Sequence, residues 1–170
     1  EDTNPPAVYS GAISIADNIP GFATENNCDL AGHTAVARIW MGNAATVSTH
    51  YDMLDNIVGV VAGRRRFTLF PPQQLPNLYV GPIDFTLSGQ PVSMVSLKEP
   101  DFEKYPRFKE ALAAAEVADL EPGDLLYIPK LWWHHVESLD RFNTIVNYWW
   151  NNTALGSDIP FTTMMHGLIS

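Results

Sequence analysis

A histidine and an aspartate stand two residues apart in the segment Thr49-His50-Tyr51-Asp52. Side chains alternate between the two faces of an extended strand, so His50 and Asp52 project to the same side. A distant histidine, His134, could complete a set of two imidazoles and one carboxylate, which is typical of non-haem Fe(II) sites that keep coordination positions open. A His-x-Asp triplet alone is a weak signal, and its alternatives are a surface turn or a hydrogen-bonded core histidine.

Three consecutive arginines, Arg64 to Arg66, begin an apolar segment, and alternation distinguishes between them. Arg65 shares its face with Phe67 and Leu69, so we expect its side chain to point inward. The two flanking arginines then point outward into solvent. Because a buried charge needs a partner, the sequence predicts either a salt bridge or an anionic ligand at Arg65.

The composition places the chain among globular proteins. Of its 170 residues, 46% are hydrophobic and 17% are charged, whereas a disordered chain would carry more charge. This length fits one domain with a substantial buried core. The formal net charge of -9 argues against a sequence-independent nucleic-acid binder, which needs clustered Lys and Arg to displace counterions from phosphates.

Three features bear on the compartment and on the ends of the chain. A single cysteine, Cys28, excludes an intrachain disulfide. No apolar run approaches the ~18 residues of a membrane span and no charged-then-apolar leader opens the chain, so we expect a cytoplasmic protein. The chain starts at Glu1 without a methionine and stops within a helix-like pattern at residues 160–170, so we expect a fragment truncated at both ends.

Short apolar or alternating segments bounded by Gly, Pro, Asn and Asp predict a mostly β chain. The strand candidates are residues 7–13, 35–41, 46–51, 56–61, 64–70, 125–129, 132–139 and 142–150. Short strands at this spacing favour an all-β fold, either a small β-barrel or a double-sheet jelly roll. No boundary divides the chain, so we expect a single domain over residues 1–170.

The remaining segments connect these strands. Gly42-Asn43 is a dipeptide typical of hairpins, and Gly63 ends an apolar run, so we expect Arg65 on the far strand of a second hairpin. Residues 73–100 predict an irregular insertion. The alanine-rich residues 108–117 predict a helix.

Six motifs follow one another along the chain. They are His50-Tyr51-Asp52, Asn56, Gly63 to Pro72, Glu121 to Pro129, Trp132 to Ser138 and Asn147-Tyr148-Trp149. In order and spacing this series resembles the cupin-like JmjC hydroxylases, over residues from about Tyr9 to Trp150. An ordered set of this kind is far more specific than any single motif.

The resemblance implies a double-stranded β-helix, the cupin-like jelly-roll barrel, that holds Fe(II) and uses 2-oxoglutarate and O2 as co-substrates. By the family pattern His50, Asp52 and His134 are the metal ligands and the catalytic centre. Alternation cannot choose between His134 and His135 without a strand register, so this choice rests on the family. His135 is then either a histidine that lies next to the ligands or one that faces outward.

The resemblance also assigns residues to the co-substrate. Arg65 falls where the family usually has a lysine that pairs with the distal carboxylate of 2-oxoglutarate, and arginine can bind a carboxylate through two hydrogen bonds. Tyr9 resembles a tyrosine of the first barrel strand that reaches the same carboxylate, although an ordinary strand tyrosine fits as well. Asn56, Asn147 and Trp149 would flank the co-substrate, and satisfied core asparagines are the alternative.

The implied reaction is hydroxylation of a C–H bond, with a protein or peptide side chain as the expected substrate and a small molecule as another. Lysine demethylation is an alternative within the same family. A sugar isomerase or epimerase and a non-catalytic binding protein are alternatives on the same barrel. We expect no nucleic-acid or membrane partner, and a homodimer could form through segments that this chain lacks.

Overall fold

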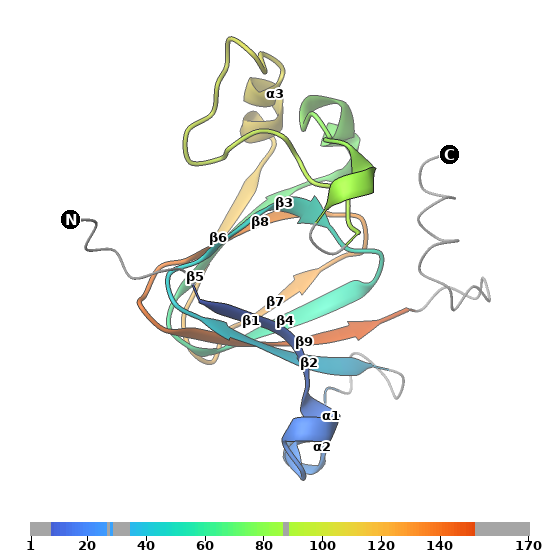
Figure 1. Ribbon diagram of the computed structural model, residues 1–170, viewed down its shortest axis with the longest axis vertical. Helices are drawn as coiled ribbons and strands as arrows, with labels where there is room; N and C mark the ends of the chain where they lie inside the picture. Colours follow the sequence, from blue (N-terminus) through green and yellow to red (C-terminus); the bar gives the residue numbers. More distant parts are fainter. Residues whose placement is uncertain (1–7, 27, 29–34, 87–88, 152–170) are drawn as a thin grey trace.

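The computed structural model describes residues 8–26, 28, 35–86 and 89–151 (Figure 1). Within these ranges the strands are β1 (Tyr9–Ser14), β2 (Val36–Gly42), β3 (Thr46–Tyr51), β4 (Asp55–Ala62), β5 (Arg65–Phe70), β6 (Glu116–Leu120), β7 (Leu125–Ile128), β8 (Trp133–Ser138) and β9 (Asn143–Trp150). The helical segments are α1 (Ile15–Asn18), α2 (Phe22–Glu25), η2 (Pro72–Asn77), η3 (Ile83–Phe85) and α3 (Phe108–Ala113). The helix-like pattern at 160–170 lies outside the described residues.

The strands form two antiparallel sheets that pack face to face (Figure 1). Sheet A has the order β1-β2-β9-β4-β7 and sheet B the order β3-β8-β5-β6. Apolar side chains of both sheets, among them Val58, Phe67, Val136 and Ile145, are buried together between them. This arrangement confirms the predicted all-β, double-sheet jelly-roll fold.

The chain crosses from one sheet to the other between β2 and β3 and again between β4 and β5, so the hairpins predicted at these two places are wrong. β4 pairs with β7 and β9, whereas β5 pairs with β6 and β8. Likewise β2 lies in sheet A and β3 in sheet B. Gly63 makes the crossing from β4 to β5 at a φ of +72°, and a Cβ there would collide with the carbonyl oxygen of Phe142. The glycine at which the sequence predicted a hairpin turn is therefore the place where the chain crosses from one sheet to the other.

The predicted helix over 108–117 is shorter than expected. Helix α3 ends at Ala113, and the chain continues as strand β6, which pairs with the edge of β5. Pairing with an open sheet edge outweighs the helix preference of the alanine-rich segment. None of the helices in the described ranges has the length and apolar character needed to cross a bilayer.

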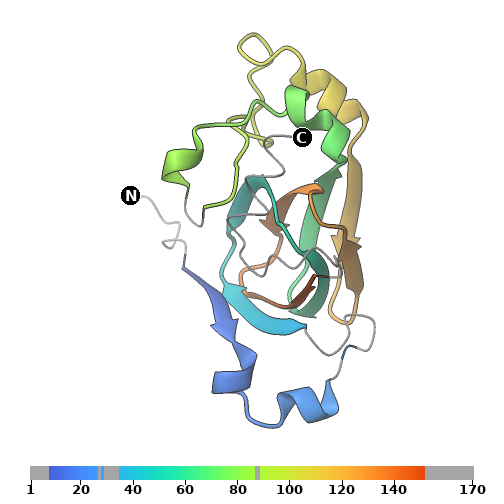
Figure 2. The same ribbon diagram turned by 90° about the vertical axis from the view of Figure 1, so that its right-hand side faces the viewer.

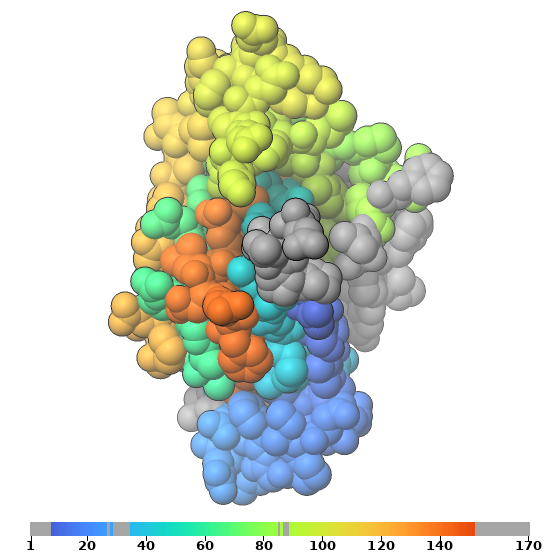
Figure 3. Space-filling view, turned by 60° about the vertical axis from the view of Figure 1, so that its left-hand side comes forward, coloured from blue at the N-terminus to red at the C-terminus, as the bar shows by residue number. Residues whose placement is uncertain are grey.

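Residues 71–86 and 89–115, which we call the excursion, cover the outer face of sheet B. Apolar side chains of the excursion and of the sheet, including Phe70, Leu78, Phe108 and Trp133, form a second buried cluster there. The excursion lies at one end of the molecule, and α1 and α2 lie at the other (Figures 1, 2 and 3). It also reaches the free edge of β3, where Val92 forms a β-bridge with His50.

Candidate metal centre

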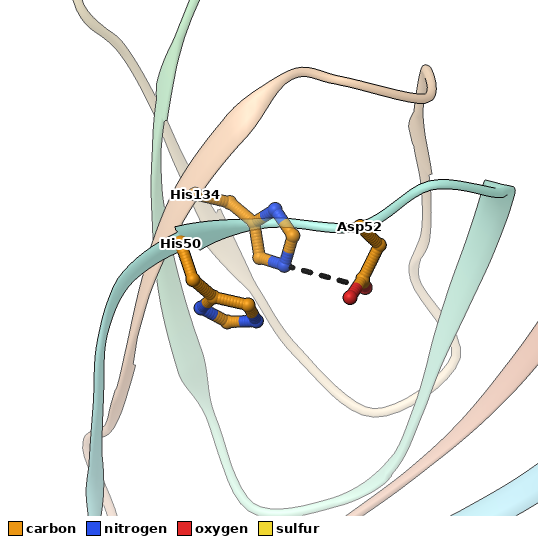
Figure 4. A group of neighbouring side chains, drawn as sticks. All are labelled: His50, Asp52 and His134. Carbon is orange, nitrogen blue, oxygen red and sulfur yellow. Dashed lines mark ion pairs between the residues drawn. The ribbon is translucent and has the colours of Figure 1, made fainter. Parts of the chain in front are cut away.

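Strands β3 and β8 bring the two predicted histidines side by side. His50 and His134 are paired residues in this antiparallel ladder, and their ring centroids lie 4.3 Å apart. Asp52 follows the end of β3 and turns its carboxylate toward both rings (Figure 4). Potential ligand atoms of the three side chains all lie within 4.8 Å of one another. Two residues near the end of one strand and one on its neighbour therefore converge, although they are far apart in sequence.

Backbone carbonyls orient both imidazole rings. Nδ1 of His50 lies 2.8 Å from the carbonyl oxygen of Ser48, and Nδ1 of His134 lies 3.1 Å from that of Trp132. A carbonyl oxygen only accepts hydrogen bonds, so Nδ1 must be the protonated nitrogen in each ring. The lone pair then resides on Nε2, which is the nitrogen that each ring offers to the site.

His134 is neutral at ordinary pH. Burial, and then the neighbouring His50, lower its pKa to about 4, and the opposing effect of Asp52 is smaller. The 3.8 Å approach of its Nε2 to Oδ2 of Asp52, drawn as a dashed line in Figure 4, is therefore not a charged pair at neutral pH. A neutral imidazole with a free Nε2 is the form that binds metal ions.

The strand register separates His134 from His135. Neighbouring residues on a strand face opposite sides, and the His135 ring contacts the hydroxyl of buried Thr49, with 3.4 Å between Oγ1 and Nδ1. His135 does not line the cavity that contains His134. The sequence alone could not make this distinction.

A cavity of about 640 Å³ opens beside the two histidines, between the sheets. Its walls are largely apolar, with Val58, Phe67, Val136 and Ile145 among them. It is also lined by every residue that the sequence predicted for the site, namely Tyr9, His50, Asp52, Asn56, Arg65, His134, Asn147 and Trp149.

Arg65 is a buried cation in this cavity. Arg65 is only 1% exposed. Within the described part of the chain, its side chain forms no ion pair with a carboxylate. Its Nε and Nη2 have no hydrogen-bond partner among those residues. Burial lowers the pKa of Arg65, and the interaction with the Tyr9 hydroxyl opposes this shift. A structural salt bridge, the alternative for Arg65, is not found in the described ranges.

The two flanking arginines lie outside, as strand alternation predicted. Arg64 forms an ion pair with Asp140 at 2.9 Å, and Arg66 forms one with Asp119 at 2.7 Å. Both pairs are exposed to solvent. Only the middle arginine therefore faces the cavity.

Two asparagines form a polar wall of the cavity. Nδ2 of Asn147 donates a hydrogen bond of 2.8 Å to Oδ1 of Asn56, across the pairing of β9 with β4. Oδ1 of Asn147 has no partner among the described residues, and neither has Nε1 of the nearby Trp149. The asparagine pair is thus partly satisfied internally and keeps one acceptor free.

Sequence reasoning missed several polar side chains of this cavity, among them Trp40, Thr86 and Gln90. Gln90 extends from the excursion and donates a hydrogen bond of 3.4 Å from Nε2 to Oδ1 of Asp52. Neither Gln90 nor Thr86 belongs to a periodic segment, so no sequence signal places them here. Trp40 lies on a predicted strand, but its face becomes clear only once the register of that strand is known.

Comparisons with known proteins identify the family. The family model described as the cupin-like domain matches residues 1–155. The chain is 38% identical over 122 residues to lysine-specific demethylase JMJ31 of Arabidopsis thaliana, covering 71% of the chain and 22% of that protein. It is 40% identical over 104 residues to tRNA wybutosine-synthesizing protein 5 of Gallus gallus, covering 61% of the chain and 30% of that protein.

Two further likenesses complete the comparison. The chain is 36% identical over 113 residues to HSPB1-associated protein 1 of Homo sapiens, covering 65% of the chain and 22% of that protein. Among solved structures it is similar to the Escherichia coli ribosomal oxygenase YcfD, with 19% identity, a TM-score of 0.42, and coverage of 70% of the chain and 24% of that chain. It thus spans 22% to 30% of the length of these four proteins. Because the family model covers nearly all of its residues, the chain belongs to the cupin-like domain family, as its ordered motifs predicted.

Proposed function

We propose that this domain is a 2-oxoglutarate-dependent oxygenase that binds Fe(II) and hydroxylates a C–H bond. One observation carries the proposal. Two histidines and an aspartate converge in a cavity whose wall also contains Arg65, a buried cation without a carboxylate partner among the described residues. A metal site explains the first feature, and an anionic co-substrate explains the second.

The donor set fits the metal. Two imidazoles and one carboxylate form the ligand set of non-haem Fe(II) oxygenases, a set that keeps coordination positions free for other ligands. His50 and His134 would bind through Nε2, and Asp52 through its carboxylate. When bound, Fe(II) supplies the redox chemistry with O2, while the protein supplies orientation and a dry environment.

The chain's own residues would position the co-substrate. Arg65 can pair with the distal carboxylate of 2-oxoglutarate through two parallel N–H donors, and Tyr9 can donate its hydroxyl to the same group. Asn147 and Trp149 would contact the part of the co-substrate nearer the centre. Apolar side chains around them exclude water, which strengthens the charged contacts.

For the primary substrate, a protein or peptide side chain is our proposal. The matched relatives include a lysine-specific demethylase and a tRNA wybutosine-synthesizing protein, so their names point to both protein and tRNA. The formal charge of -9 favours a protein over tRNA, because binding to a phosphate backbone requires clustered cations. We place hydroxylation before lysine demethylation because the motif series resembles hydroxylases.

The cavity argues against the other two readings. A sugar isomerase or epimerase would use a metal in the barrel, but this function leaves the buried Arg65 without an anionic partner. A non-catalytic binding protein would not need two histidines and an aspartate within 4.8 Å of one another. An oxygenase accounts for both the three metal-binding side chains and the unpaired Arg65, because its metal and its co-substrate bind in the same cavity.

Turnover of 2-oxoglutarate tests the proposal. We expect wild-type protein with Fe(II), ascorbate and O2 to form succinate, and replacement of His50, Asp52 or His134 by alanine to abolish it. Arg65→Ala should mainly raise the concentration of 2-oxoglutarate required, because it removes an anchor for the co-substrate and leaves the metal ligands in place. Unchanged succinate formation by Asp52→Ala would contradict the assignment.

A further inference from the structure

Unpartnered polar atoms concentrate in the cavity. In the described part of the chain, nine buried side-chain nitrogen or oxygen atoms have no hydrogen-bond partner, and six of them belong to cavity-lining residues. Four of those six are N–H donors: Nε and Nη2 of Arg65, Nε1 of Trp40 and Nε1 of Trp149. Burying a donor without an acceptor is unfavourable, so this concentration predicts a ligand rich in acceptor oxygens.

Trp40 is the member of this set with no role so far. It lies on β2 opposite Ile145 of β9, and both residues line the cavity. A Cβ on Gly11 would collide with Cε3 and Cζ3 of the Trp40 ring, so the bare backbone of Gly11 receives that edge of the indole. In an indole, Nε1 lies on the opposite side of the ring from these two carbons. The N–H group is therefore turned away from Gly11, at a buried position.

Tyr9 connects Trp40 to the buried arginine. Its ring stacks on that of Trp40, with centroids 5.8 Å apart and planes at 30°. Its hydroxyl interacts electrostatically with the Arg65 guanidinium, which opposes the lowering of the Arg65 pKa by burial. The Trp40 ring also meets Trp149 edge-on at 5.8 Å. Trp40, Tyr9 and Arg65 thus form one contiguous group in the cavity wall.

We propose that Nε1 of Trp40 is a third donor to the distal carboxylate of 2-oxoglutarate, beside Arg65 and Tyr9. This inference rests on the proposed function. A carboxylate offers about four lone-pair positions. A bidentate arginine fills two of them and a tyrosine hydroxyl a third, which leaves one for the indole N–H.

The test is Trp40→Phe, which removes the N–H group and keeps an aromatic ring. Binding is measured by calorimetry on Zn(II)-loaded protein, with 2-oxoglutarate and with 2-oxobutanoate, which has the same keto-acid group but lacks the distal carboxylate. We expect the dissociation constant for 2-oxoglutarate to rise about tenfold or more, as for loss of a hydrogen bond to a charged group. The dissociation constant for 2-oxobutanoate should not change. Both ligands are measured on one preparation, so partial unfolding would lower the number of sites and leave the two constants unaffected.

Trp150→Phe is the matched control. Nε1 of Trp150 is also buried without a partner among the described residues, but Trp150 packs with Ile57 and does not line the cavity. This variant should bind both ligands as the wild type does. In thermal unfolding, 2-oxoglutarate should raise the midpoint of Trp150→Phe as much as that of the wild type, and that of Trp40→Phe by less.

The outcomes separate the two proposals. If the wild type and Trp150→Phe bind 2-oxoglutarate and Trp40→Phe binds it equally well, the role of Trp40 is wrong and the proposed function stands. Equal weakening of both ligands in Trp40→Phe would also overturn it, because the indole would then act on the cavity as a whole. If the wild type binds no 2-oxoglutarate, both proposals fail.

Discussion

Arg65 concentrates the chemistry of the site in a single residue. The guanidinium of a residue that is only 1% exposed, and that lacks a carboxylate partner among the described residues, should oppose folding until an anion binds. It sits one position from two arginines whose ion pairs are exposed, so the same residue type has different roles on the two faces of one strand.

Arg65→Met tests this interpretation. In the absence of ligand we expect the free energy of unfolding to stay the same or to rise, because an apolar side chain replaces an unpaired buried charge. The stabilisation that 2-oxoglutarate gives to the wild type should disappear. Chemical denaturation with and without 2-oxoglutarate measures both effects, and Arg66→Met is the control on the outer face. A loss of about 3–5 kcal/mol in ligand-free Arg65→Met, as for a broken buried ion pair, would instead indicate a structural partner.

Individual residues also mark the limits of sequence reasoning. Strand alternation placed Arg65 inward and its neighbours outward because this inference needs only the period of a strand. It could not choose between His134 and His135, since that choice depends on which residues face each other across β3 and β8. Trp40 was missed for the same reason.

At the scale of elements, the excursion forms part of the site. Val92 forms a bridge with His50, and Gln90 donates to one oxygen of Asp52 while the other oxygen lies 3.8 Å from His134. A partner that holds one carboxylate oxygen orients the other toward the metal position. The excursion therefore contacts two of the candidate metal ligands, His50 through the backbone of Val92 and Asp52 through the amide of Gln90.

Gln90→Ala should weaken metal binding without preventing it. The hydrogen bond to Asp52 is long, at 3.4 Å, so we expect the dissociation constant for Co(II) to rise about 3- to 10-fold. Titration of the metal-free protein followed by visible absorption measures this constant without turnover. Gln73→Ala, at an exposed position of the same excursion, is the matched control. Identical affinities in the two variants would exclude a positioning role for Gln90.

Most strands could be predicted from sequence, whereas their connections could not. Gly and Pro at the ends of alternating segments mark where a strand stops, and this information is local. Whether the next strand pairs with the preceding one or crosses to the other sheet depends on distant strands. The predicted hairpin at Gly63 was wrong for this reason. The predicted helix over 108–117 was too long because the chain leaves it to pair with the open edge of β5, and the sequence of the segment contains no information about that edge.

At the scale of the whole molecule, metal binding should stabilise the folded state. The three ligand side chains come from β3, the residue directly after it, and β8, so they converge only when sheet B has formed. Metal at about one hundred times its dissociation constant should raise the free energy of unfolding by about 2.7 kcal/mol. Thermal and chemical unfolding with Mn(II), before and after a chelator, measure this effect.

Two aspartate variants make that experiment specific. Asp52→Ala should remove the stabilisation by Mn(II), whereas Asp84→Ala, at an exposed position, should keep it. Equal stabilisation in the two variants would indicate that the metal binds elsewhere.

The bridge between Val92 and His50 has a consequence for the solubility of the molecule. β3 is an outer strand of sheet B, and such strands can recruit a strand from another chain and start aggregation. Here the backbone N–H of Ser93 donates a hydrogen bond of 2.8 Å to the carbonyl oxygen of Thr49, and the excursion so occupies part of the edge of β3. Shortening the excursion to enlarge the cavity would therefore also open a surface for self-association, and a redesign would have to block it with a charged side chain or a proline.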